Sequence, residues 1–120
     1  MKQLFAMLTA GTFFYALVWS LSAPTASVQA AAGNAANGKK LYAAQCTVCH
    51  GVLGKGDGPA GKSLKPPARD LSSGVFKYGS SDAALAKLIK TGKSPMPGFA
   101  NLSDQQLKDL VAYIRTLKKK

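Results

Sequence analysis

The chain has 120 residues, enough for one domain, and 47% of them are hydrophobic. Its formal net charge is +11, from 16 Lys and Arg against five acidic residues. Such a surplus suits an acidic protein surface or an anionic membrane face. Nucleic-acid-binding proteins are also basic, but the export signal described next argues against a nucleic-acid partner.

The first 30 residues have the pattern of a secretory signal peptide. Lys2 precedes an apolar run over residues 4–21, and small residues follow, so we expect cleavage after Ala30 or Ala32. An uncleaved membrane anchor is the alternative, because the run of 18 residues approaches the length that spans a bilayer. In both cases the remainder is exported, and we expect it in the periplasm or otherwise outside the cytoplasm.

The exported part is small. Residues 31–36 predict a flexible lead-in, and residues 37–120 predict one domain. A domain of this size often depends on a disulfide, a metal or a bound cofactor for stability. Cys46 and Cys49 are so close in sequence that a disulfide would close only a tiny loop, so a large apolar cofactor would serve better.

The first predicted helix leads into the two cysteines. It begins near residue 37, with Asn34 or Asn37 as the candidate N-cap. Gly38, Tyr42 and Cys46 are spaced by four residues and therefore share one helical face.

A long loop follows over residues 51–67. Its five glycines and three prolines rule out a long helix or a central strand. Seventeen residues without secondary structure are unusual in a compact domain, so we expect this loop to wrap around something. A short helical turn is predicted at residues 68–71.

Two further helices complete an all-α fold. The first has Ser81 as its N-cap and ends at Gly92, with Leu85, Leu88 and Ile89 on one face. The second opens with a capping box formed by Ser103 and Gln106. Its apolar residues recur with helical period: Leu107, Leu110, Val111, Ile114 and Leu117. No alternating pattern predicts a strand.

The most specific feature is the string Cys46-Thr47-Val48-Cys49-His50. Two cysteines three residues apart on a helical turn can bond to the two vinyl groups of a haem, and the adjacent His can then reach the iron. A thioredoxin-like redox pair would need a βαβ context, and a zinc site would need four ligands. Because the sequence provides neither, the string predicts one covalently attached haem c.

Met96 is the candidate for the second axial ligand. Residues 31–120 contain one His and one Met, so a second His from the same chain is impossible. Met96 lies between Pro95 and Pro97, in a segment that cannot be helical and has little backbone freedom. Such a segment suits a sulfur that is held in one place. An open iron site or a lysine ligand is the alternative.

The sequence resembles the class I cytochromes c, in particular the small bacterial monohaem types. The resemblance covers nearly all of residues 37–117 and rests on the first helix, the cysteine–histidine string, the Gly58-Pro59 step, the Met segment and a last helix with Leu110 and Tyr113.

This resemblance implies a wrap of three to five helices around one haem. The first and last helices would cross at Gly38, with Tyr42 and Tyr113 packed at the crossing. In the family a proline carbonyl accepts the ring N–H of the haem-binding His, a bond that fixes the ligand's orientation. Pro59 matches that position, with Pro66 and Pro67 as alternatives.

The predicted function is one-electron transfer rather than enzymatic catalysis. Iron ligated by His50 and Met96 has no vacancy for a substrate, and this ligand pair raises the reduction potential. We expect a monomer that meets acidic redox partners, with association with a membrane surface as a further role of the charge. A haem subunit bound permanently to a periplasmic dehydrogenase is one alternative, and a gas-binding haem protein is another.

Two groups of residues are candidates for the surface around the haem. One group would ring the exposed haem edge: Lys55, Lys62, Lys65 and Lys93. The other would contact the haem propionates: Arg69, Lys77 and Tyr78.

Overall fold

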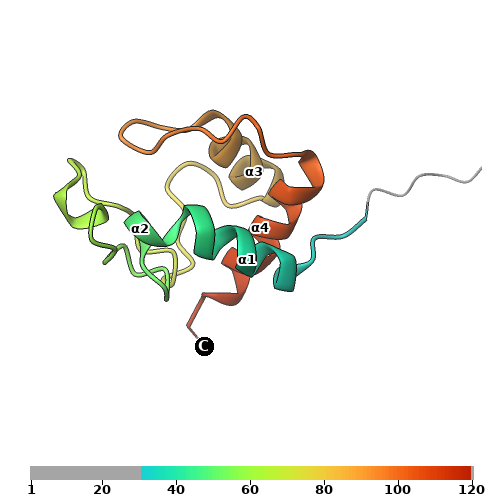
Figure 1. Cartoon of the computed structure of the whole chain (residues 1–120), viewed down its shortest axis with the longest axis horizontal. Coiled ribbons are helices and arrows are strands. Elements are labelled where there is room, and N and C mark those ends of the chain that lie inside the picture. The colour runs from blue at the N-terminus through green and yellow to red at the C-terminus, as the bar shows by residue number, and fades with distance from the viewer. Residues whose placement is uncertain (1–30, 120) are drawn as a thin grey trace, which may run out of the picture.

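A computed structural model describes residues 31–119, so the predicted signal peptide lies outside the described residues. The elements in chain order are α1 (Ala35–Gln45), α2 (Thr47–His50), the 3₁₀ turn η1 (Gly61–Ser63), α3 (Asp82–Thr91) and α4 (Asp104–Thr116). Within residues 31–119 there is no strand, only a single bridge between Lys93 and Met96. The predicted all-α class is confirmed (Figure 1).

Asn34 is the N-cap of α1. Its side-chain oxygen accepts hydrogen bonds from the backbone N–H groups of Ala36 and Asn37, at 2.9 and 3.1 Å. These bonds satisfy donors that have no partner inside the helix. The helix therefore begins two residues before the predicted start, and the folded domain takes in part of the segment that was expected to be a flexible lead-in.

The caps predicted for α3 and α4 are confirmed. The Ser81 side chain accepts the N–H of Ala84 at 3.1 Å, and Gly92 is the C-cap of α3. At the start of α4, the side chains of Ser103 and Gln106 each accept the other's backbone N–H, at 3.2 and 2.9 Å. These short-range signals fix where both helices begin.

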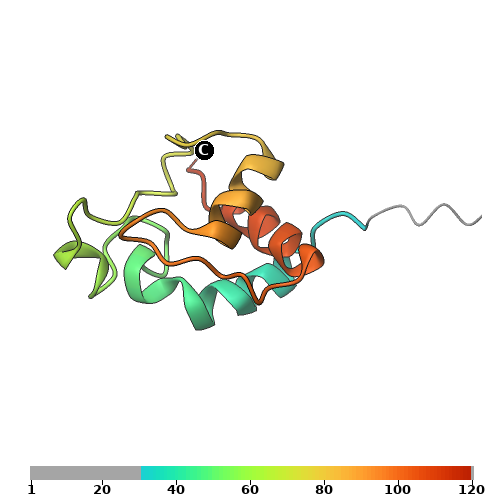
Figure 2. The same ribbon diagram turned by 90° about the horizontal axis from the view of Figure 1, so that it is seen from above.

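α1 and α4 cross closely, as the resemblance implied (Figures 1 and 2). Gly38 lies at the contact: a Cβ on it would overlap the carbonyl group of Asp109 and come within 2.9 Å of the Tyr113 Cβ. Beside this point the rings of Tyr42 and Tyr113 pack with centroids 5.2 Å apart. The predicted packing at the crossing is confirmed.

The helical turn predicted at residues 68–71 is wrong. The only short helical turn in the stretch between α2 and α3 is η1. Residues 68–71 form no helical turn because their backbone groups pair with the preceding loop: Ala68 N–H donates to the Gly61 carbonyl at 3.0 Å, and Leu71 N–H to the Gly54 carbonyl at 2.6 Å. The long loop is thus closed on itself by its own backbone.

The core lies where α1, α3 and α4 meet. Its buried apolar side chains are Tyr42, Leu85, Ile89, Leu102, Leu107, Leu110, Val111 and Ile114. In both ribbon views the loop that joins α3 to α4 extends toward α2 and then returns to the start of α4 (Figures 1 and 2). None of the helices within residues 31–119 is long and apolar enough to cross a membrane.

Candidate haem site

A cavity of about 290 Å³ lies between α2, the segment before α3, and the loop after α3. Cys46, Cys49, His50 and Met96 all line it, so the structure brings together four of the five predicted site residues. Most of the remaining wall is apolar, with contributions from Leu64, Leu71, Phe76, Leu85, Leu88 and Phe99.

The cysteine–histidine string forms one helical turn of its own. α1 ends at Gln45, and the N–H groups of Cys49 and His50 donate to the Cys46 carbonyl at 3.2 and 2.9 Å. Gly51 ends α2 directly after the His, and its carbonyl accepts the buried Tyr42 hydroxyl at 2.8 Å. This turn is therefore fixed at both ends and presents both thiols and the imidazole to the cavity.

Cys46 and Cys49 are half-buried and form no disulfide with each other. Burial raises the pKa of the Cys46 thiol to about 11, with a further contribution from the neighbouring Cys49. A thioredoxin-like pair depends on a lowered thiol pKa, and the pKa of Cys46 is shifted in the opposite direction.

The His50 ring is oriented by a backbone carbonyl. Its Nδ1 lies 3.0 Å from the carbonyl oxygen of Arg69. Because a carbonyl oxygen can only accept, Nδ1 must carry the hydrogen and donate it. Nε2 then keeps its lone pair, which is the form of histidine that binds a metal.

Pro59 does not have the predicted role, since the acceptor of the His50 N–H is Arg69. Pro59 instead lines a separate hollow together with Thr47, Gly58 and neighbouring loop residues. The cause is the path of the loop: the N–H groups of Gly58 and Ala60 donate to the carbonyls of Cys49 and Val48, at 3.2 and 3.0 Å. These bonds hold the residues around Pro59 against the backbone of α2.

The two alternative candidates, Pro66 and Pro67, both line the cavity. Neither is the acceptor, because Arg69 lies two residues after Pro67. No sequence pattern marks the Arg69 carbonyl as the acceptor, because a carbonyl is common to every residue. The Pro66-Pro67 pair is the nearest available indication, because prolines limit the path by which the loop returns past the His.

Met96 reaches the cavity from the loop after α3. Lys93 N–H donates to the Met96 carbonyl at 3.0 Å, and Met96 N–H donates back to the Lys93 carbonyl at 2.8 Å. Phe99 N–H donates to the Ile89 carbonyl at 3.0 Å, which fastens the loop to α3. Met96 is half-buried and packs against the core, so the thioether is held by a closed turn.

Positive side chains line part of the cavity. Arg69, Lys77 and Tyr78, the predicted propionate contacts, are all lining residues. The ammonium groups of Lys77 and Lys93 lie 5.6 and 5.7 Å from the centroid of the Tyr78 ring. Among the four lysines predicted to ring the haem edge, only Lys93 lines the cavity.

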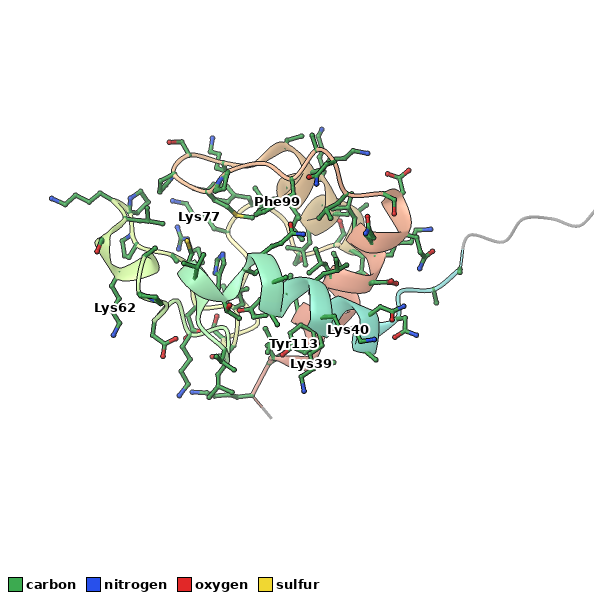
Figure 3. All side chains as sticks on the ribbon, in the orientation of Figure 1. Lys39, Lys40, Lys62, Lys77, Phe99 and Tyr113 are labelled. Atoms are coloured by element: carbon green, nitrogen blue, oxygen red, sulfur yellow. The ribbon has the colours of Figure 1, made fainter. Side chains whose placement is uncertain are left out.

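Figure 3 shows the difference between these lysines. Lys77 lies beside the cavity, whereas Lys62 extends from the far end of the long loop. A ring made by Lys55, Lys62, Lys65 and Lys93 is therefore only partly supported, and Lys77 replaces the loop lysines as a neighbour of Lys93.

The residues present fit a haem c. The walls are apolar, as the macrocycle requires, two thiols lie on one helical turn, and the adjacent imidazole has a fixed Nδ1 donor and a free Nε2 lone pair. A thioether lines the same cavity from another segment.

Comparison with known proteins decides the family. The family model described as Cytochrome c matches residues 35–118. The chain belongs to the cytochrome c family. It is a class I c-type cytochrome, a monohaem electron carrier with covalently attached haem c.

Individual relatives agree with this family. Cytochrome c-554(547) of Halothiobacillus neapolitanus is 38% identical over 92 residues, which are 72% of this chain and 100% of the relative. Cytochrome c6 of Nostoc sp. is 32% identical over 117 residues, covering 95% of this chain and 92% of the relative. A solved c-type cytochrome, KustC0563, is 32% identical with a TM-score of 0.59, over 68% of this chain and 98% of that chain.

Proposed function

We propose that this cytochrome c is an exported one-electron carrier whose haem is bonded to Cys46 and Cys49 and ligated by His50 and Met96. The observation that supports this ligand set best is the environment of His50: its Nδ1–H donates to the Arg69 carbonyl, so Nε2 is free for iron. Cys46, Cys49 and Met96 line the same cavity as this ring.

The ligand set explains why electron transfer is the function and catalysis is not. With both His50 and Met96 as ligands, the iron would offer no position to a substrate. The pair of His and Met raises the reduction potential. The apolar wall favours the ferrous state further, because burial disfavours the more charged ferric centre.

Acidic redox proteins are the proposed partners. Arg69, Lys77 and Lys93 line the cavity, and none of the five Asp residues does so in the described part of the chain. Two of those carboxylates pair with cations elsewhere, Asp82 with Arg115 and Asp104 with Lys90. The cavity therefore presents positive charge to an approaching protein.

We further propose that the mature protein is a monomer of the periplasm or another exported space. If residues 1–30 are not removed, they would keep it at the membrane. A permanent haem subunit of a dehydrogenase would copurify with its enzyme, whereas a free carrier purifies alone. A gas-binding protein would bind carbon monoxide readily in the reduced state, which a firm Met96 ligand prevents.

The test of this function is covalent attachment. Extraction with acidic acetone should leave the haem on the polypeptide, and the mass of the holoprotein should exceed that of the processed chain by one haem. Cys46→Ala and Cys49→Ala should each reduce attachment, and the double variant should abolish it. Haem in the organic layer from the wild type would contradict the proposal.

A further inference from the structure

The Arg69 carbonyl that orients His50 belongs to a loop, not to a helix, so something must hold it in place. The segment that bears it approaches the haem-binding turn at two glycines of the long loop, Gly56 and Gly61. Both glycines are buried.

Gly56 lies between the backbone of His50 and that of Arg69. Its N–H donates to the His50 carbonyl at 2.8 Å. A Cβ on Gly56 would overlap the Ala68 carbonyl oxygen and lie 3.2 Å from the carbonyl carbon of Arg69. Gly56 also has a φ of +75°, a conformation that glycine adopts without strain.

Gly61 makes the second close approach. Its carbonyl accepts the N–H of Ala68 at 3.0 Å. A Cβ on Gly61 would overlap the Cys49 carbonyl oxygen and come within 2.9 Å of the Ala68 Cβ. The residue before Arg69 thus lies against both glycines, and Gly61 lies between it and the carbonyl of Cys49.

We infer that Gly56 and Gly61 are positioning residues. Because neither has a side chain, the segment that contains Arg69 can approach closely enough for its carbonyl to accept the His50 Nδ1 hydrogen, and this bond sets the strength of His50 as a ligand. The inference rests on the ligation by His50 proposed above. A carbonyl that accepts the Nδ1 hydrogen raises the basicity of the imidazole as a ligand. A stronger donor favours ferric iron, so weakening this hydrogen bond should raise the reduction potential.

A Cβ on Gly56 should push the backbone of residues 68 and 69 away from His50. A Cβ on Gly61 should push Gly61 away from the Cys49 carbonyl, and Ala68, which is hydrogen-bonded to Gly61, should move with it. The Nδ1 to oxygen distance is 3.0 Å, and N–H···O bonds weaken beyond roughly 3.2 Å, so a displacement of a few tenths of an ångström matters. Because the acceptor is a backbone atom, no substitution of Arg69 removes it. The glycines are the part of the chain through which the bond can be altered.

The experiment compares Gly56→Ala and Gly61→Ala with Gly74→Ala in the full-length holoprotein. Gly74 is a matched control for Gly56, because its φ of +71° has the same cost but the nearest atoms to its Cβ would be carbons of the flexible Lys118 side chain. NMR gives the rate at which the His50 Nδ1 proton exchanges with solvent, and redox titration gives the midpoint potential.

For Gly56→Ala and Gly61→Ala we expect exchange of that proton to quicken roughly fivefold, the factor for a hydrogen bond weakened by about 1 kcal/mol. The midpoint potential should shift upward in both variants. Gly74→Ala should match the wild type in both measurements, because a general loss of stability does not change the hydrogen bond between His50 and Arg69.

Wild-type values from both glycine variants would overturn the inference. If Gly56→Ala yields no holoprotein, Gly61→Ala decides, because its φ imposes no strain. The wild type provides a direct test as well: a Nδ1 proton that exchanges as fast as that of a free histidine would refute the bond. Haem that acidic acetone extracts from the wild type would instead refute the proposed function.

Discussion

Met96 is the residue whose replacement has the most specific expected effect. In the ferric holoprotein a Met sulfur on the iron should give a weak long-wavelength absorption band. Met96→Ala should remove this band, lower the reduction potential because the thioether ligand is lost, and let the reduced protein bind carbon monoxide. Optical spectra, redox titration and carbon monoxide binding at neutral pH measure the three effects.

Leu88→Ala is the matched control for Met96→Ala. Leu88 lines the same cavity and has no atom that can ligate iron. The control should keep the band and the resistance to carbon monoxide. Rapid carbon monoxide binding by the wild type would show that Met96 is not a firm ligand and would favour a gas-binding protein.

The candidate residues were predictable to different degrees. Cys46, Cys49, His50 and Met96 were found from the sequence because their side chains have a chemistry that few other residues share, and the structure places all four on one cavity. The acceptor for His50 was assigned to Pro59 and was found at Arg69. A backbone carbonyl has no sequence signature, so only the path of the loop could identify it.

At the scale of the helices, the crossing of α1 and α4 depends on Gly38. Gly38→Leu should force the two helices apart and lower the free energy of unfolding by about 1–3 kcal/mol, the usual cost of overpacking. Ala44→Leu is the control, because Ala44 lies exposed on α1 and such substitutions change stability by about 0.5 kcal/mol or less. Urea unfolding of both holoproteins measures the difference, and equal midpoints would contradict the crossing.

A buried carboxylate links the start of α1 to α4. Asp109 is 4% exposed, and it accepts the Asn34 N–H at 2.7 Å and a Gln105 side-chain N–H at 2.9 Å. The Asn34 bond is the main cause that holds the pKa of Asp109 below its ordinary value. A carboxylate with a lowered folded-state pKa stabilises the fold above its unfolded pKa of about 4, and this contribution is lost as the pH falls further.

Asp109→Asn should therefore be less stable than the wild type at pH 7, by about 1–3 kcal/mol for charge-assisted hydrogen bonds. The difference should shrink as the pH falls below about 4. Asp82→Asn is the control, since this exposed partner of Arg115 should contribute less than about 1 kcal/mol. Unfolding free energies at pH 7 and pH 3 test the prediction, and a difference independent of pH would contradict it.

The helices show why some elements were predictable and others were not. The caps at Ser81 and Ser103 were predicted, and Asn34 was one of two candidates for the first helix, because each cap involves residues two or three positions apart. The turn expected at residues 68–71 failed because Ala68 and Leu71 donate to carbonyls of the preceding loop. Helix propensity depends on neighbouring residues, so it could not predict these longer-range hydrogen bonds.

At the scale of the whole molecule, some positive side chains are paired with carboxylates and others are not. On the side of α3 and α4, Lys90 and Arg115 are paired with carboxylates. Lys77 and Lys93 flank the Tyr78 ring on the cavity, where no carboxylate lines the wall in the described chain. We therefore expect Lys77 and Lys93, rather than the lysines of the long loop, to contribute most to docking.

This distribution predicts how electron transfer depends on salt. The screening length is roughly 30 Å at about 0.01 M salt and roughly 8 Å at about 0.15 M. Attraction to an acidic partner should therefore make the second-order rate fast at low salt and markedly slower at high salt. Very tight docking can make release limiting, in which case the rate passes through a maximum at intermediate salt.

Lysine variants locate the surface responsible for this dependence. Lys77→Gln and Lys93→Gln should slow association more than Lys39→Gln, because Lys39 is not among the cavity residues and lies away from Lys77 in Figure 3. All three substitutions remove one charge, so they change the net charge equally and differ only in position. The measurement is the second-order rate with the isolated physiological oxidase or reductase across a salt series. Equal effects from the three variants, or a rate that does not change with salt, would show that docking does not use the face with Lys77 and Lys93. The surplus positive charge would then serve membrane association or solubility.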